Sequence, residues 1–223
     1  MLHRRTNPYL IQRRDTSAYL RALFDSAEAR NWPKKRLGEL IQLRKDVVHP
    51  HDNPSGPARF VGLENIESLT GRRTGFVQVE TSELTGRKPR FYRGDIVYGY
   101  LRPYLNKVWI AEFDGLSSVD QYVFTVRHAA AEAEFVAWFM RSPVYLERAP
   151  IETTPGQLPR IRTDEVASVE LGVPPIEEQR KLCAIIGDQM KEVTQLRTTL
   201  EQQLAHISAL PAALLRRAFD GGL

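Results

Sequence analysis

Toward the C-terminal end, ten positions follow one another at strictly alternating spacings of four and three residues, and eight of them are apolar. They are Leu182, Ile186, Gln189, Val193, Leu196, Leu200, Gln203, Ile207, Leu210 and Leu214. This spacing is typical of a heptad coiled coil and predicts a helix over about 176–210 that pairs with a partner. The alternative is a long core helix of one domain, but five heptads without a slip favour pairing.

Prolines mark both ends of this helix. Pro174 and Pro175 indicate where it starts. Pro211 lacks the N–H group that would bond one turn back, which predicts a kink or restart near 208–211 and a short last helix over 212–219.

The pattern is compatible with self-pairing. In an antiparallel register whose residue numbers sum to 396, every seam residue opposes another, for example Leu196 and Leu200. That register sets Gln189 against Ile207, whereas a parallel register pairs each glutamine with its own copy. The pattern alone leaves the orientation open.

Shorter patterns precede the heptads. Helical spacing predicts a helix capped by Ser17 that reaches about residue 30, a helix-like turn over 36–43 and a buried helix over 130–140. Strand-like runs separated by turn residues lie at 59–63, 76–79, 95–101, 108–113, 121–126 and 169–173. Because the strands cluster and do not alternate with helices, we predict an α+β fold with a mostly antiparallel sheet and packed helices.

We expect three parts. Residues 1–33 form an N-terminal arm, irregular over 1–14, with a short helix; 34–173 form one globular domain; and 174–223 form a coiled-coil helix. A 223-residue chain with 42% hydrophobic residues can bury one such core. The single cysteine, Cys183, excludes an internal disulfide framework, and no apolar run is long enough to span a bilayer, so a cytoplasmic protein is expected.

Charge is unevenly distributed. Residues 34–107 contain 14 Lys and Arg against 8 Asp and Glu, whereas 108–175 contain 5 against 10. Clustered positive charge among aromatic residues is typical of a surface that contacts phosphates. The alternative is a solvated face without a partner.

Catalytic motifs are missing from the sequence. It contains no glycine loop of the Walker type and no nucleophile-elbow serine. His49, His51 and Asp52 fit a solvated loop better than a metal site, and Asp95 and Glu112 have the residue type of nuclease carboxylates without a supporting motif. We therefore expect a non-catalytic chain with no cofactor or metal.

The sequence does contain candidate residues for binding DNA. Arg102, Tyr104 and Lys107 follow a predicted strand, and Gln157 and Arg160 lie on a loop, where a scaffold can present cations, a phenol and an amide to DNA. The other candidates for DNA contact are Arg72, Arg73, Lys88 and Arg90. The alternative for each is a solvated surface role.

Three motifs that follow one another along the chain resemble those of a known family. Gly94-Asp95-Ile96-Val97-Tyr98 is followed by Leu101-Arg102-Pro103-Tyr104-Leu105-Asn106-Lys107-Val108 and by Asp114-Gly115-Leu116-Ser117-Ser118. In this order they resemble the target-recognition domain of Type I restriction-modification specificity subunits. The join Val173-Pro174-Pro175-Ile176-Glu177-Glu178-Gln179-Arg180-Lys181 resembles that family's boundary between recognition domain and spacer helix. The likeness covers about 34–223.

The resemblance implies a half-size subunit. The family's usual member has two recognition domains and two antiparallel spacer helices, and each domain reads half of a split DNA target, whereas this chain has one of each. It would then form a homodimer or pair with a second half subunit through Leu182, Ile186, Val193, Leu196, Leu200, Ile207, Leu210 and Leu214. A cropped chain is the competing explanation.

The implied function is recognition of double-stranded DNA for a partner adenine methyltransferase subunit, which would use S-adenosylmethionine, with or without a restriction translocase subunit. Two other classes stay open. One is a fragment of a nuclease or methyltransferase, and the other is a coiled-coil adaptor whose globular domain binds protein.

Overall fold

The computed structural model describes residues 8–127, 129–151 and 156–219. Its contacts divide the chain into two compact units. The first, called the globular unit here, is Arg13–Cys183, and the second contains 8–12 and 184–219 among the described residues. The predicted boundaries at residues 33 and 173 stay predictions.

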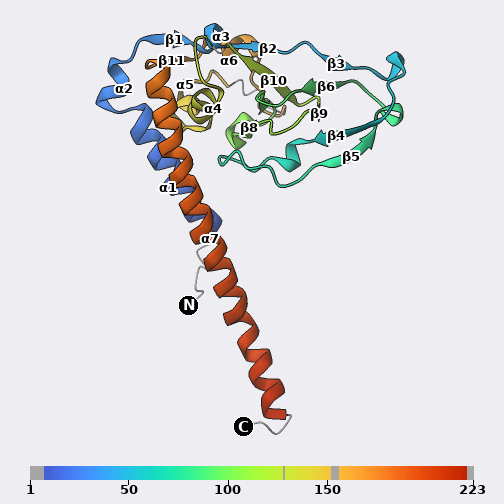
Figure 1. Cartoon of the computed structure of the whole chain (residues 1–223), viewed down its shortest axis with the longest axis vertical. Helices are drawn as coiled ribbons and strands as arrows, with labels where there is room; N and C mark the ends of the chain where they lie inside the picture. The colour runs from blue at the N-terminus through green and yellow to red at the C-terminus, as the bar shows by residue number, and fades with distance from the viewer. Residues whose placement is uncertain (1–7, 128, 152–155, 220–223) are drawn as a thin grey trace. The chain divides into compact units, whose positions relative to one another are not determined.

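The globular unit has the predicted α+β architecture (Figure 1). One antiparallel sheet has the strand order β2-β10-β7-β8, formed by Ile41–Leu43, Gln121–Val126, Ile96–Gly99 and Val108–Ile110. A second has the order β3-β6-β9-β4-β5, formed by Val47–Val48, Lys88–Phe91, Gly115–Ser117, Pro57–Val61 and Val77–Glu80. Within it β4 and β9 run parallel. A separate pair joins β1 (Lys34–Arg36) to β11 (Glu170–Gly172).

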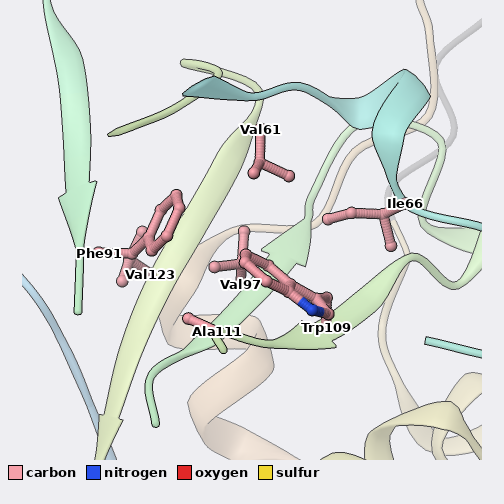
Figure 2. Close-up of a cluster of buried hydrophobic side chains, with 7 residues drawn as sticks. All are labelled: Val61, Ile66, Phe91, Val97, Trp109, Ala111 and Val123. Atoms are coloured by element: carbon pink, nitrogen blue, oxygen red, sulfur yellow. The ribbon is translucent and has the colours of Figure 1, made fainter. Parts of the chain in front are cut away.

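A core of buried apolar side chains joins the two larger sheets (Figure 2). Val97, Trp109 and Val123 come from the four-stranded sheet, and Val61 and Phe91 come from the five-stranded sheet. The rings of Phe91 and Trp109 meet edge to face, with centroids 5.3 Å apart. Ile66 and Ala111 complete the cluster from connecting segments.

Helices cover the other side of strand β7. The globular unit contains the helices α2 (Ala27–Asn31), α3 (Leu37–Leu40), α4 (Ala133–Arg141), α5 (Pro143–Arg148) and α6 (Thr163–Ser168), and 3-10 turns at Pro50–Asp52, Leu63–Asn65, Thr81–Glu83 and Pro103–Leu105. Tyr98 of β7 packs edge to face on Tyr145 of α5, with centroids 6.0 Å apart. Because Val97 faces the sheet core and Tyr98 the helices, β7 is buried on both faces, which explains its unbroken apolar run.

The chain is helical from Pro8, which corrects the predicted irregular arm over 8–14, whereas 1–7 lie outside the described residues. Helix α1 runs from Pro8 to Phe24, so Ser17 lies inside it and does not cap it. Proline is favoured in a first helical turn, where its missing N–H has no partner to lose. The serine that caps is Ser26, whose Oγ accepts a hydrogen bond from the backbone N–H of Ala29 at 2.9 Å at the start of α2. Phe24 packs against α4 through Phe135, with centroids 5.6 Å apart.

The last element is helix α7, Ile176–Phe219. Its start agrees with the prediction, but it continues through Pro211, so the predicted restart and separate last helix are wrong, while a kink near 208–211 stays a prediction. Proline removes a single hydrogen bond, and the neighbouring alanines Ala209 and Ala212 are strong helix formers. None of the described helices combines the length and apolar character needed to cross a bilayer.

A buried glutamine anchors the start of α7 within the globular unit. Gln179 is 1% exposed. Its side-chain amide donates to the carbonyl of Pro174 at 2.8 Å, and its Oε1 accepts from the backbone N–H of Glu132 at 2.9 Å. Arg180 forms an ion pair with the Glu132 carboxylate at 2.6 Å. These contacts explain why a glutamine and an arginine stand at the join that resembles a domain boundary.

The strand predictions are right for one strand, shifted for five others and missing for the rest. Residues 121–126 form β10 as predicted, and 59–63, 76–79, 95–101, 108–113 and 169–173 overlap β4, β5, β7, β8 and β11 with shifted ends. Strands β1, β2, β3, β6 and β9 were not predicted, and the predicted helix-like turn over 36–43 ends at Leu40, after which β2 begins. These strands are two to four residues long, too short for an alternating pattern to be recognised.

Candidate nucleic-acid interface

The segment after β7 is a rigid loop built around a 3-10 turn. Arg102 and Asn106 flank the turn Pro103–Leu105, and both have left-handed backbone conformations, with φ of 52° and 46°. Asparagine adopts this region readily, whereas arginine there is uncommon and costs free energy. The Lys107 ammonium donates to the carbonyl of Leu63 at 2.5 Å. Much of this motif therefore builds the loop, while Arg102 and Tyr104 project into solvent.

A second loop is hydrogen-bonded to the first. The backbone N–H of Arg102 donates to the carbonyl of Pro159 at 2.7 Å, and that of Ile161 donates to the carbonyl of Tyr100 at 3.2 Å. Leu101 and Arg160 form an isolated β-bridge between them. Two segments that are more than fifty residues apart in sequence therefore lie side by side.

These two loops present four of the predicted DNA-contacting residues together. We call them the recognition surface: Arg102, Tyr104, Gln157 and Arg160. All four are exposed. None has a side-chain hydrogen bond or ion pair to another residue that the structure describes. Their donors are thus available to an external acceptor such as a phosphate or a base edge.

A stacked tyrosine pair supports the recognition surface. The rings of Tyr100 and Tyr122 are nearly parallel, with centroids 4.3 Å apart. The Tyr122 hydroxyl donates to the carbonyl of Ile161 at 3.3 Å, which ties the second loop to β10. Burial and then the Asp120 carboxylate raise the pKa of Tyr100, and the nearby charges of Arg160 and Arg87 oppose that rise.

Arg87 was not among the predicted residues. It is exposed, and its charge opposes the rise in the pKa of Tyr100. Its signal in the sequence was its place in the basic run Arg87-Lys88-Pro89-Arg90, next to two residues that were predicted.

The other five predicted residues have contacts within the chain. Arg72 forms an ion pair with buried Glu67 at 2.9 Å, and Lys107 holds Leu63 as described. Arg73 donates to Glu112 at 3.0 Å, and its guanidinium lies 5.0 Å from the ring centroid of Phe113.

Strand β6 carries the remaining two. The ammonium of Lys88 lies 5.5 Å from the ring centroid of Phe60, and Arg90 is 3.7 Å from the Asp46 carboxylate. Arg90 and Tyr92 also line a shallow hollow over the five-stranded sheet whose lining contains none of the recognition surface. DNA contact by these five residues stays a prediction.

The two carboxylates considered for a nuclease have structural partners. Asp95 is 4% exposed and accepts hydrogen bonds from Arg44 Nε at 2.7 Å, Arg44 Nη2 at 2.8 Å and the backbone N–H of Tyr92 at 2.8 Å. Glu112 binds Arg73. Across residues 8–127, 129–151 and 156–219, no three His, Cys, Asp or Glu side chains are placed to hold a metal ion.

The seam of α7 is exposed over most of its length. Ile186 is fully buried and Leu182 and Val193 are partly buried, but Leu196, Leu200, Ile207 and Leu210 are 53–64% exposed. The side chain of Leu214 lies outside the described part. A row of exposed leucine and isoleucine side chains on one helix is unusual for a surface without a partner.

The globular unit thus presents cations, a phenol and an amide on two loops, and helix α7 carries exposed apolar side chains along its seam. No family model matches the chain. It is 26% identical over 193 residues to the Type I restriction enzyme EcoDI specificity subunit of Escherichia coli, a match that covers 86% of this chain and 42% of that protein. The chain is therefore a homologue of Type I specificity subunits and spans about half the length of the curated relative it matches.

Solved structures show the same fold. The HsdS subunit from Thermoanaerobacter tengcongensis matches with a TM-score of 0.67 and 22% identity, over 80% of this chain and 47% of that one. A chain from a study of complex assembly and conformational transition of the type I R-M system matches with a TM-score of 0.69 and 23% identity, over 84% and 49%. The Type I S subunit from M. genitalium matches with a TM-score of 0.52 and 12% identity, over 94% and 54%.

Proposed function

We propose that this chain is a non-catalytic DNA-recognition subunit of a restriction-modification complex, and that its globular unit reads one half of a bipartite target. The observation that supports this most is the recognition surface, where two loops that are distant in sequence bring Arg102, Tyr104, Gln157 and Arg160 together, and where none of the four has a side-chain hydrogen-bond or ion-pair partner among the described residues. The similarity to specificity subunits over most of this chain supports the same function.

Each side chain suits a different contact. The guanidinium groups of Arg102 and Arg160 can bind phosphate or form two hydrogen bonds with guanine O6 and N7, and the Gln157 amide can do the same with adenine N6 and N7. The Tyr104 hydroxyl suits a phosphate oxygen. We propose that base contacts select the site while phosphate contacts provide affinity that depends on salt.

The proposed partners follow from the same role. A methyltransferase subunit would bind this chain and use S-adenosylmethionine, which this chain does not need, and a restriction translocase subunit would join in complexes that also cleave. Such a complex acts on cytoplasmic DNA. The other proposed partner of this chain is a second half subunit, either an identical copy or a different chain, which would read the other half-site.

The exposed seam of α7 is the proposed pairing surface. Leu196, Leu200, Ile207 and Leu210 are too exposed to stabilise a lone helix. A second copy in the antiparallel register places Leu196 opposite Leu200, which buries these exposed seam residues on both chains. We propose that the length of this helix pair sets the distance between the two half-sites.

The experiment measures DNA binding by fluorescence anisotropy at several salt concentrations, with the full chain alone and with its methyltransferase subunit. Arg102→Ala and Arg160→Ala should each weaken binding, and each lost phosphate contact should lower the salt slope by about one. The matched control is Arg93→Ala, because Arg93 is also exposed but precedes β7, at the end of that strand opposite Arg102.

Three results would decide against this function. Equal affinity for Arg102→Ala, Arg160→Ala and the unchanged chain would remove the recognition surface from DNA binding. Absence of DNA binding even with the methyltransferase subunit would favour a protein-binding adaptor. DNA cleavage with Mg²⁺, or methyl transfer from S-adenosylmethionine by the purified chain alone, would favour an enzyme.

A further inference from the structure

Five large apolar side chains of the globular unit, as far as it is described, are more than two-fifths exposed. They are Phe76, Val77, Tyr104, Val119 and Leu158, with exposed fractions between 42% and 53%. Single exposed apolar residues are ordinary on a protein surface, whereas a group gathered in one place indicates an interface.

Two of the five are explained by the fold. The ring of Phe76 packs edge to face on Phe113, with centroids 5.6 Å apart, and the guanidinium of Arg59 lies 5.6 Å from its centroid. Val77 lies on β5, the outermost strand of its sheet, opposite Phe60.

The other three gather around one short segment. Tyr104 lies two residues after Arg102 in the first loop. Leu158 precedes Pro159, whose carbonyl accepts the Arg102 N–H at 2.7 Å. Val119 precedes Asp120, whose carbonyl accepts the Tyr100 N–H at 3.1 Å. Three separate parts of the sequence therefore bring apolar side chains to the edge of the recognition surface.

We propose that Leu158 and Val119 contact the C5 methyl group of thymine in the major groove, beside the polar base readers. This inference rests on the proposed function and deepens it by naming a base that the surface selects. Phosphate contacts need no apolar partner, so apolar side chains among unpaired cations indicate base contact. Of the groups that bases present in the major groove, the thymine methyl is the apolar one.

An apolar group beside arginine and tyrosine also occurs in protein interfaces. The charges favour DNA here. Arg102, Arg160 and the nearby Arg87 have no carboxylate partner within the described residues. A patch with unpaired positive charge fits a polyanion better than a neutral protein surface.

The test begins with selection of preferred sites from duplexes with a randomised centre, using the full chain together with its methyltransferase subunit. Each thymine of the selected site is then replaced in turn by deoxyuridine, which lacks only the methyl group. At one position at least, this replacement should weaken binding about fourfold, the effect of one methyl group leaving an apolar contact.

Variants connect that effect to the proposed residues. Leu158→Ala or Val119→Ala should weaken binding to the thymine duplex about three- to tenfold and should remove most of the difference between thymine and deoxyuridine. Val77→Ala is the matched control, because Val77 is 50% exposed and lies apart from these loops. Thermal unfolding of each variant shows that the fold is retained.

The following results would overturn the proposal. One is a selected site in which no thymine is sensitive to deoxyuridine, and another is a sensitivity that persists in both variants. Loss of methyltransferase binding in these variants with unchanged DNA affinity would make the patch a protein interface. Failure to select any sequence at all would overturn the proposed function itself, so the two failures are distinguishable.

Discussion

Single residues of the same type have different roles in this chain, and their neighbours decide which. Arg44 and Arg102 are both arginines in the basic half of the globular unit. Arg44 binds the buried Asp95 carboxylate through two nitrogens and lies 4.6 Å from the ring centroid of Tyr92. Arg102 has no such partner among the described residues. A paired cation stabilises the fold, and an unpaired one is available for a ligand.

Replacement of Asp95 should show how strongly its pairing holds the domain. Asp95→Ala leaves the Arg44 guanidinium and the Tyr92 N–H without their acceptor in a site that is largely buried. We expect a loss of about 3 kcal/mol in the free energy of unfolding, the usual cost of removing one partner of a buried ion pair. Urea unfolding followed by circular dichroism measures it.

Asp52→Ala provides the comparison. Asp52 is exposed, and its carboxylate lies 3.4 Å from His51 Nε2 on the surface. That change should alter the free energy of unfolding by less than about 0.5 kcal/mol. Equal effects of the two substitutions would mean that the Asp95 network does not stabilise the domain.

Among the strands, β9 shows how close packing constrains a short element. It lies between β6 and β4 in the five-stranded sheet. A Cβ atom at Gly115 would lie 2.4 Å from the carbonyl oxygen of Arg59 and 2.7 Å from the ring of Phe91. Neighbouring backbone and a core ring therefore require glycine at the start of this strand.

Gly115→Ala should destabilise the protein by about 1–3 kcal/mol, because the added methyl group has no room without movement of β4 or Phe91. Gly86→Ala is the matched change, since nothing lies within 4 Å of the Cβ it would add. The second substitution should be neutral or slightly stabilising. Thermal melts of both variants test this, and similar melting temperatures would refute the packing argument.

For the molecule as a whole, assembly depends on α7. Placing Asp at both Leu196 and Leu200 puts charges in the centre of the proposed pairing surface, where no partner would neutralise them. We expect the dimer or higher assembly to dissociate while the globular unit keeps its melting behaviour. Light scattering coupled to gel filtration measures the mass.

Asp at Gln195 and Thr199 is the control, because both residues are exposed on α7, have the same spacing and lie beside the seam positions. This pair should leave the mass of the assembly unchanged. A single monomeric species for the unchanged chain, both alone and with its methyltransferase subunit, would contradict pairing altogether.

Local sequence patterns were enough to predict the elements that depend little on contacts with distant parts of the chain. Strand β10 and the beginning of α7 after Pro175 were predicted at the right residues. The α+β class followed from the order of these patterns. Spacing along the chain carries this information because one face of a helix or strand must be apolar before it can pack.

Other features depend on residues that are far apart in the sequence. Short β6 and β9 exist because they pair with each other and with β3 and β4. The nine predicted DNA-contacting residues were alike as cations, amides and phenols, and only three-dimensional contacts separate Arg102 and Arg160 from Arg73 and Lys107. Whether a polar side chain is available to a ligand depends on the partners around it, and folding brings those partners from distant segments of the chain.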